Sequence, residues 1–160
     1  MRIERNTDYA LILDQAREMA GGAPSPTAAL ANLSALIYNS LGGVNWAGFY
    51  LMENGRLILG PFQGKPACAV IPAGRGVCGS AALKDMTLVV PDVHRFDGHI
   101  ACDSASNSEI VIPLHLGNEV AGVLDIDSPE YSRFSGDDKA GLEAVARCAE
   151  DMLAAFDRIV

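Results

Sequence analysis

Apolar positions recur at two different spacings along the chain, and the two spacings predict different elements. Near both ends they recur every three or four residues, which is typical of a helix with one apolar face. We therefore predict helices over residues 7–20, 26–41 and 135–160. Between the second and third helices the apolar positions alternate or form short runs, which is typical of strands. The pattern predicts helices at both ends of the chain around a sheet.

A residue typical of a helix start stands at or just before the first position of each of these three segments. Thr7 is a candidate cap for the first helix. Ser25 followed by Pro26 combines a capping hydroxyl with a proline in the first turn, where a backbone N–H has no partner within the helix. Ser135 with Asp138 three residues later resembles a capping box, in which the two residues bond each other's backbone N–H groups.

Two turn signals predict β-hairpins in the middle of the chain. Asn54-Gly55 separates two apolar runs, and Asn-Gly is the strongest short signal for a tight hairpin turn. A second pair of runs turns at Gly117-Asn118. Because each hairpin supplies two antiparallel strands, four strands of a sheet follow directly from these signals.

Residues 61–108, called the roof below, are less regular. They contain a short strand, a glycine-rich turn, a short helix from about residue 77 to 84, a further strand and a long loop over residues 94–108. Together with the hairpins they predict an α+β fold in which six strands form one antiparallel sheet. The terminal helices then pack on one face of the sheet, and the roof covers a pocket on the other face.

Length and charge narrow the possible functions. A chain of 160 residues suits a single domain over residues 1–160. The net charge of −8 argues against nucleic acid and anionic membranes as partners, because both attract basic surfaces. No apolar run reaches the roughly 18 residues of a membrane helix, and the first residues lack the apolar core of a signal peptide. We therefore expect a cytoplasmic protein.

The four cysteines fall into two groups. A cytoplasmic compartment keeps thiols reduced, so four cysteines do not predict a structural disulfide framework. Cys148 lies beside the apolar stripe of the last helix and is interpreted as a packed core residue. Cys68, Cys78 and Cys102 occupy three separate segments of the roof. They are either three unrelated small residues or a set for thiol chemistry, in which one thiol attacks and another resolves the product as a disulfide.

A zinc site is the alternative use of these cysteines. His94, His99 and Cys102 lie within nine residues, and Cys68 and Cys78 could complete the ligand set. The chain contains no Cys-x-x-Cys pair, however, and the spacing of Cys68 and Cys78 fits no common zinc pattern. The two histidines are better interpreted as residues that hold the loop backbone or tune a neighbouring thiol.

Alternation places Asp125 and Asp127 on the same face of one strand. They form either a solvated face or, with Glu109, a cluster of acids that lines the pocket. Such a cluster would bind a cationic group such as an α-ammonium, and one of its acids would stay protonated because like charges raise a pKa. Trp46, the single tryptophan, is either a core residue or an apolar wall for a ligand.

Five segments resemble one enzyme family in their order along the chain. NWAGFYL, PFQGKPAC, IPAGRGVCG, VPDVHRFDGHIACDSASNSEIVIPL and GVLDIDSP are similar to segments of the free methionine-(R)-sulfoxide reductases, which have the GAF fold. The resemblance runs from about residue 30 to 157, and the HIACDSASNSEIV block is the most specific part. One departure is Asp97, where the family often has proline, and it affects no functional position.

The resemblance implies a role for each matching residue. Cys102 corresponds to the catalytic cysteine, Cys68 to the main resolving cysteine and Cys78 to a further cysteine in disulfide exchange. Glu109, Asp125 and Asp127 correspond to the acids that bind the substrate and polarise its sulfoxide, and Trp46 and Tyr50 to aromatic residues near it. The family uses thioredoxin as reductant, needs no metal or organic cofactor, and often forms homodimers. A GAF sensor without catalysis is the alternative function, because the fold alone proves none.

Overall fold

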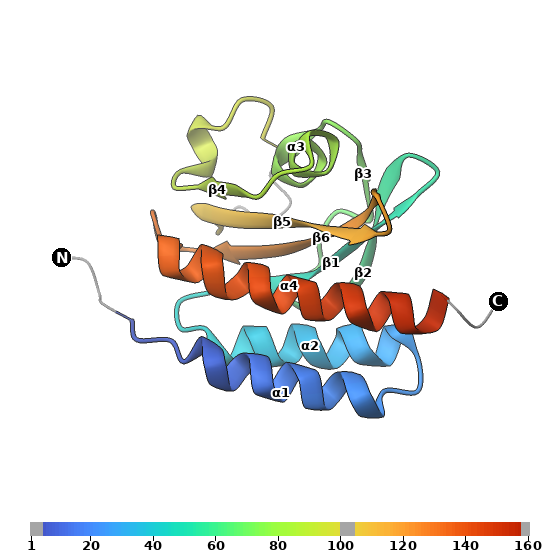
Figure 1. Ribbon diagram of the computed structural model, residues 1–160. Helices are drawn as coiled ribbons and strands as arrows, with labels where there is room; N and C mark the ends of the chain where they lie inside the picture. The colour runs from blue at the N-terminus through green and yellow to red at the C-terminus, as the bar shows by residue number, and fades with distance from the viewer. Residues whose placement is uncertain (1–4, 100–104, 158–160) are drawn as a thin grey trace.

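The computed structural model of the chain describes residues 5–99 and 105–157. Its helices are α1 (Tyr9–Gly22), α2 (Pro26–Ser40), α3 (Gly76–Lys84) and α4 (Gly136–Asp157), with a 3-10 turn η1 (Val93–Arg95). Its strands are β1 (Trp46–Glu53), β2 (Arg56–Gly64), β3 (Val70–Pro72), β4 (Leu88–Val90), β5 (Ser108–Leu116) and β6 (Glu119–Ser128). Figure 1 shows α1, α2 and α4 on one side of the sheet and α3 on the other.

The helix starts agree with the sequence at two of the three predicted caps. The Ser25 hydroxyl accepts a hydrogen bond from the Ala28 N–H. Ser135 and Asp138 form the predicted capping box, with bonds of 2.8 and 3.1 Å in the two directions. The cap of α1 was predicted wrongly as Thr7. The helix begins later, at Tyr9, so that Asp8 is the residue whose side chain accepts from a first-turn N–H.

The described strands form one antiparallel sheet in the order β3-β2-β1-β6-β5-β4. Both predicted hairpins are confirmed. Asn54 and Gly55 have φ angles of 52° and 76°. These are the left-handed values that a two-residue turn between twisted strands requires, and Asn and Gly adopt them at little cost. The two hairpins pair through β1 and β6, which therefore lie at the centre of the sheet.

The face of the sheet toward the terminal helices, called the helix face below, is covered by an apolar core. α2 and α4 pack on the strands, and α1 packs against these two helices. Alternate apolar residues from the middle of β5 and β6 enter this core, as do residues of β1 and the apolar stripes of the helices. The strand residues are Ala47, Phe49, Ile110, Ile112, Leu114, Leu124 and Ile126.

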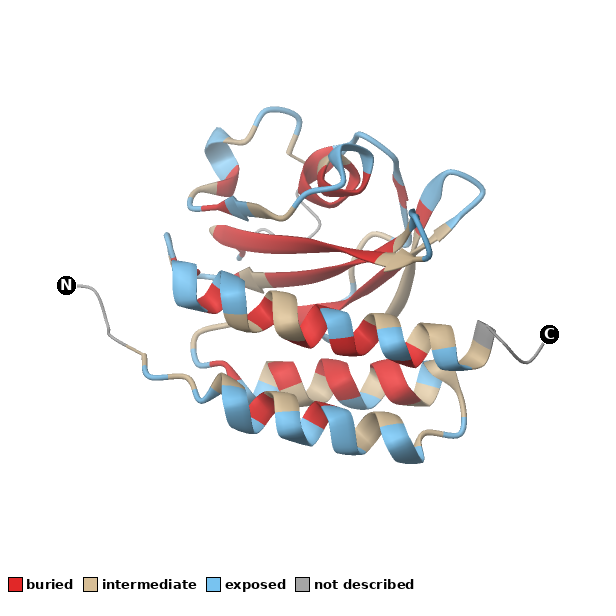
Figure 2. Ribbon diagram, viewed as in Figure 1, coloured by how far each residue is buried: buried red, intermediate tan, exposed pale blue. Residues whose placement is uncertain are grey.

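The opposite face, called the roof face below, is covered by α3 and the connections around it. Figure 2 shows that α3 is buried on this side of the sheet. A second apolar cluster joins α3 to strand residues such as Val111 and Val123. The predicted arrangement, with terminal helices on one face and a roof on the other, is therefore confirmed. Within the described residues, no helix is both long and apolar enough to cross a membrane.

Candidate functional site

The strand register brings three acidic residues together on the roof face. Glu109 on β5 lies directly opposite Asp127 on β6, and Asp125 lies two residues before Asp127 on the same side of the strand. On the other side of β6, Trp46 of β1 is the partner of Asp127. Glu109 and Asp125 are buried, with 7% and 5% exposure, and Asp127 is half-buried. The predicted cluster of acids therefore lines a pocket and is not a solvated surface.

Two aromatic residues of β1 form another wall of the pocket and hold part of the roof in place. The Trp46 indole N–H donates to the Lys65 carbonyl oxygen at 3.1 Å, and the Tyr50 hydroxyl donates to the Cys68 carbonyl oxygen at 2.9 Å. The two rings stack on one another. Both side chains are almost fully buried and also line the pocket. Trp46 is thus a core residue and an apolar wall at once.

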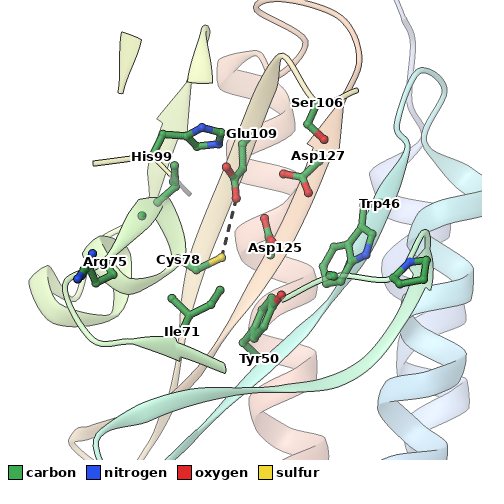
Figure 3. A pocket seen from close by; sticks show the side chains of 14 residues that line it. Trp46, Tyr50, Ile71, Arg75, Cys78, His99, Ser106, Glu109, Asp125 and Asp127 are labelled. Atoms are coloured by element: carbon green, nitrogen blue, oxygen red, sulfur yellow. Dashed lines mark hydrogen bonds between the residues drawn. The ribbon is translucent and has the colours of Figure 1, made fainter. Parts of the chain in front are cut away.

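Cys78 enters the pocket from the first turn of α3. Its Sγ lies 3.8 Å from Glu109 Oε1, close enough for the thiol to donate a weak hydrogen bond. Figure 3 shows Glu109, Asp125 and Asp127 on the strand side of the pocket with Cys78 facing them from α3. The remaining lining residues come mostly from the roof: Pro66, Ala67, Ile71, Arg75, Gly76, Val77, His99 and Ser106.

Burial and the closeness of like charges favour the protonated forms of Glu109, Asp125 and Cys78. Burial, followed by the charges of Asp125 and Asp127, raises the pKa of Glu109 well above its ordinary value. Burial also raises the pKa of Asp125, although hydrogen bonds from Glu109 and Cys78 act in the opposite direction. The pKa of the Cys78 thiol is raised for the same reasons, burial first. The cluster therefore retains a proton at pH values where isolated carboxyl groups are ionised.

One atom of the cluster has no partner in the described part of the chain. Asp125 Oδ1 is buried and accepts no hydrogen bond from residues 5–99 or 105–157. The nearest basic residues that line the pocket are Arg75, which is exposed, and His99. Burial lowers the pKa of His99, so its ring is neutral at physiological pH. The pocket is thus built to receive a cationic group or a proton.

The cysteines separate much as the sequence predicted. Cys148 is buried in the core of the helix face, as expected. Cys68 is disulfide-bonded, whereas Cys78 and Cys148 are free within the described residues. Cys68 lies next to the pocket, in the roof segment that Tyr50 holds. Cys102, the predicted catalytic residue, lies outside the described residues.

Among the described residues, the histidines and cysteines of the zinc set suggested by their spacing do not come together. His94 Nε2 lies 2.9 Å from Asn107 Oδ1, and the Val93 N–H donates to the Asn107 carbonyl oxygen. His94 therefore holds the loop, which agrees with the interpretation that the histidines support backbone. Among described residues, the one cluster of potential metal ligands is Cys78, Glu109 and Asp125.

Sequence reasoning gave no role to several residues that line the pocket. Arg75 and Ile71 were overlooked, although Arg75 stands in the glycine-rich turn just before α3, where a residue at the helix start can face a ligand. Ser106 also lines the pocket. It is buried at the pocket and exchanges hydrogen bonds with the Asn45 side chain.

Known proteins resemble this chain over most of its length. The sequence profile of the GAF domain family matches residues 25–150. The free methionine-R-sulfoxide reductase of Escherichia coli strain K12 is 52% identical over 149 residues, which cover 93% of this chain and 90% of that protein.

Solved structures also resemble this chain over most of its length. The fRMsr of Staphylococcus aureus in its reduced form is 49% identical with a TM-score of 0.91, and the similarity covers 96% of this chain and all of that one. The same protein in complex with substrate has a TM-score of 0.89 at 48% identity and the same coverage. A putative GAF sensor protein from Burkholderia vietnamiensis is 51% identical with a TM-score of 0.86, over 88% of this chain and 90% of that one.

Proposed function

This chain belongs to the free methionine-R-sulfoxide reductase family of GAF domain proteins, and we propose that it reduces free L-methionine-(R)-sulfoxide to L-methionine in the pocket on the roof face. The observation that carries the proposal is the buried acid cluster beside Cys78. A sulfoxide oxygen leaves only when it is protonated, and the buried Glu109–Asp125 pair holds a proton.

In the first proposed step, the Cys102 thiolate attacks the sulfoxide sulfur while Glu109 donates its proton to the sulfoxide oxygen. The oxygen passes to Cys102, which becomes a sulfenic acid, and methionine leaves with its sulfur reduced by two electrons. We assign the proton to Glu109 because its pKa is raised most clearly, with two neighbouring carboxylates contributing. Asp127 is half-buried and is better placed to hold the substrate ammonium.

In the second proposed step, the Cys68 thiol condenses with the Cys102 sulfenic acid, which forms a disulfide and releases water. Two observations favour Cys68 over Cys78 for this step. Cys68 already takes part in a disulfide, whereas Cys78 is a free thiol. Cys78 is also buried and its pKa is raised, so little of it is a thiolate that could exchange. We therefore assign Cys78 to a later exchange or to holding Glu109.

The substrate fits the pocket as an amino acid with a short apolar end. The acids offer partners for its α-ammonium, and the stacked rings of Trp46 and Tyr50 offer a wall for its S-methyl group. Trp46 and Tyr50 also hold the roof segment through Lys65 and Cys68 carbonyl oxygens. A covered pocket of this kind favours a free amino acid over a methionine within a polypeptide.

We further propose that a thioredoxin-type dithiol restores the two cysteines by disulfide exchange, in the cytoplasm, where such reductants are kept reduced. A homodimer is proposed on the family resemblance alone. Replacing thioredoxin with dithiothreitol in the assay would test whether sulfoxide reduction occurs independently of the protein reductant. Sedimentation equilibrium would test the dimer.

The test of the proposed function is a coupled assay of NADPH consumption with thioredoxin and its reductase. Free methionine-R-sulfoxide, the S epimer and a peptide-bound sulfoxide are supplied in turn. We expect turnover on the free R epimer alone, its loss in Cys102→Ser, and wild-type rates in Cys148→Ser, which changes a cysteine of the helix-face core. Absence of turnover on every sulfoxide, with folded protein and with either reductant, would contradict the proposal.

A non-catalytic GAF sensor is the second candidate function. It is favoured by the similarity to a protein described as a putative GAF sensor at 51% identity. The same pocket would then bind a cationic ligand, or respond once to an oxidant through its thiols. Such a sensor would bind or oxidise stoichiometrically without releasing methionine.

A further inference from the structure

The side of the pocket formed by Cys78, Glu109 and Asp125 has the spacing of a metal site. One ligand atom from each residue lies within 4.8 Å of the other two, and the sulfur is 3.8 Å from Glu109 Oε1. In a tetrahedral zinc site, with Zn–S of about 2.3 Å and Zn–O of about 2.1 Å, neighbouring sulfur and oxygen ligands are about 3.6 Å apart. The distance between the Cys78 sulfur and Glu109 Oε1 therefore lies within a few tenths of an ångström of the spacing that a shared ion requires.

A second observation, a buried carboxylate oxygen without a hydrogen-bond partner among the described residues, points to a ligand at this cluster. Asp125 is 5% exposed and lines the pocket, and its Oδ1 accepts no hydrogen bond within the described part of the chain. A buried carboxylate oxygen without a partner is costly, and native structures normally satisfy such atoms with a donor, water or ion. Arg75, the one Lys or Arg residue in the described lining, is exposed at the mouth of the pocket.

We propose that Cys78, Glu109 and Asp125 bind one thiophilic divalent ion of the zinc class, with the fourth coordination position open to the pocket. The thiol selects the class, because magnesium and calcium prefer ligand sets made of oxygen alone, whereas zinc and cadmium accept thiolate together with carboxylate. Binding exchanges protons for metal. The ion displaces the Cys78 S–H proton and the proton shared by the carboxyl groups, and no electrons are transferred.

The consequence for activity rests on the proposed function. An ion at this position would occupy Glu109 and Asp125, which the proposed chemistry needs for proton donation and substrate binding. The metal and the amino acid would therefore exclude one another. Metal binding itself requires no turnover, so it can be tested separately from the reductase activity.

Cobalt(II) titration tests the site directly, because a thiolate bound to cobalt gives a charge-transfer band and a tetrahedral site gives visible d–d bands. The starting protein is Cys68→Ser/Cys102→Ser, in which Cys78 and Cys148 are the remaining thiols. We expect one cobalt per chain with both bands. Adding Cys78→Ser should remove the charge-transfer band, whereas adding Cys148→Ser, the matched change of a buried cysteine on the helix face, should leave it unchanged.

Asp125→Asn in the same background should weaken cobalt binding at least about tenfold, because even outer-shell partners of metal ligands contribute that much. Wild-type protein with its Cys68 disulfide formed should bind cobalt in the same way. It replaces the double variant in the titration if that variant does not fold. Absence of the charge-transfer band in folded protein, or its persistence without Cys78, would overturn the proposal. Added methionine should compete with cobalt; normal cobalt binding without competition would contradict the substrate assignment and leave the metal site in place.

Discussion

Asp125 and Asp138 are both buried carboxyl groups, one on each side of the sheet, and their surroundings differ in every respect. Asp138 accepts hydrogen bonds from the Tyr9 hydroxyl at 2.6 Å and the Ser135 N–H at 2.8 Å, and it pairs with Arg133 at 3.0 Å. Asp125 shares its pocket with two further acids, and its Oδ1 has no partner in the described residues. Burial acts on both, yet the pKa of Asp138 is lowered by its partners and that of Asp125 is raised.

The difference separates Asp138, an acid with structural partners, from Asp125, the acid that we propose to be functional. On the helix side, each charge contributes to the junction of α1 with the start of α4. On the roof side, Asp125 is buried at a cost in stability with Oδ1 lacking a partner among the described residues, which is the usual mark of a site prepared for a ligand or a proton transfer. Replacing an acid on the roof side should therefore lower activity without lowering stability. Replacing Asp138 on the helix side should lower stability without lowering activity.

The largest expected effect is on catalysis at the roof face. Glu109→Gln should lower kcat/KM for free methionine-R-sulfoxide by about 10²–10⁴-fold, because it removes the proposed proton donor. Its free energy of unfolding at neutral pH should stay equal or rise by about 1 kcal/mol, because a neutral amide no longer has to be protonated to be buried. A variant that retained wild-type kcat/KM, measured by the coupled assay beside urea unfolding, would remove Glu109 from the mechanism.

Replacing the paired acid on the helix side should lower the stability of the protein and leave its activity unchanged. Asp138→Ala leaves the Arg133 guanidinium buried without its partner, which should lower the free energy of unfolding by about 3 kcal/mol. At a temperature where the variant is folded, kcat/KM should remain within about twofold of wild type. Urea unfolding measures the free energy of unfolding, and the coupled assay measures kcat/KM. A large loss of activity in folded protein would show that the two sides are coupled.

The pH dependence of stability should have opposite signs for the two acids. The raised pKa of Glu109 and Asp125 means that the folded state binds more protons, so their contribution weakens as the pH rises from about 4, the unfolded value, through the raised folded value. The lowered pKa of Asp138 gives stability that is present above about pH 4 and is lost as the pH falls through the folded value.

Difference curves would show the two signs directly. The unfolding free energy of wild type minus that of Glu109→Gln should decrease with rising pH, and that of wild type minus Asp138→Asn should increase. Thermal or urea unfolding over the acidic and neutral range measures both. Curves of the same sign would contradict the assignment of raised pKa values to Glu109 and Asp125 and of a lowered pKa to Asp138.

The smallest expected effect comes from the cysteine of the helix-face core. Cys148→Ala should cost about 1 kcal/mol of unfolding free energy through lost packing and leave kcat/KM unchanged. Cys78→Ala, at a similar burial on the roof face, should instead shift the alkaline limb of the pH–rate profile, on which activity falls as Glu109 loses its proton, because its thiol contacts Glu109. Identical pH profiles for the two variants would reduce Cys78 to a packing residue.

Local sequence signals predicted the layout of the roof-face site well. Alternation alone put Asp125 and Asp127 on one face of β6, and the turn at Gly117 predicted that β5 and β6 pair. The turn did not predict the register shift between Leu114 and His115, and this shift places Glu109 opposite Asp127. Asn54-Gly55 predicted the pairing of β1, which carries Trp46, with β2. These features depend on neighbouring residues and on the two-residue period of a strand, which a sequence displays directly.

The remaining contacts join segments far apart in the chain and had no local signal. Tyr9 reaches Asp138 across 129 positions, and the Tyr50 hydroxyl bonds a carbonyl oxygen of an irregular loop. The side that Arg75 faces depends on how the glycine-rich turn enters α3, which periodicity does not define. The burial of each acid and its pKa shift follow from these contacts. The sequence therefore predicted that one acid of the cluster stays protonated, but it did not identify Glu109 as that acid.

The most direct test of the roof-face account is a single turnover without reductant. Fully reduced protein is mixed with one equivalent of free methionine-R-sulfoxide, and methionine and disulfide-linked peptides are quantified by mass spectrometry. The account predicts one methionine per chain together with a disulfide between the Cys68 and Cys102 peptides, and neither product in Cys102→Ser. Binding of the sulfoxide without methionine release, or methionine release that survives Cys102→Ser, would contradict it.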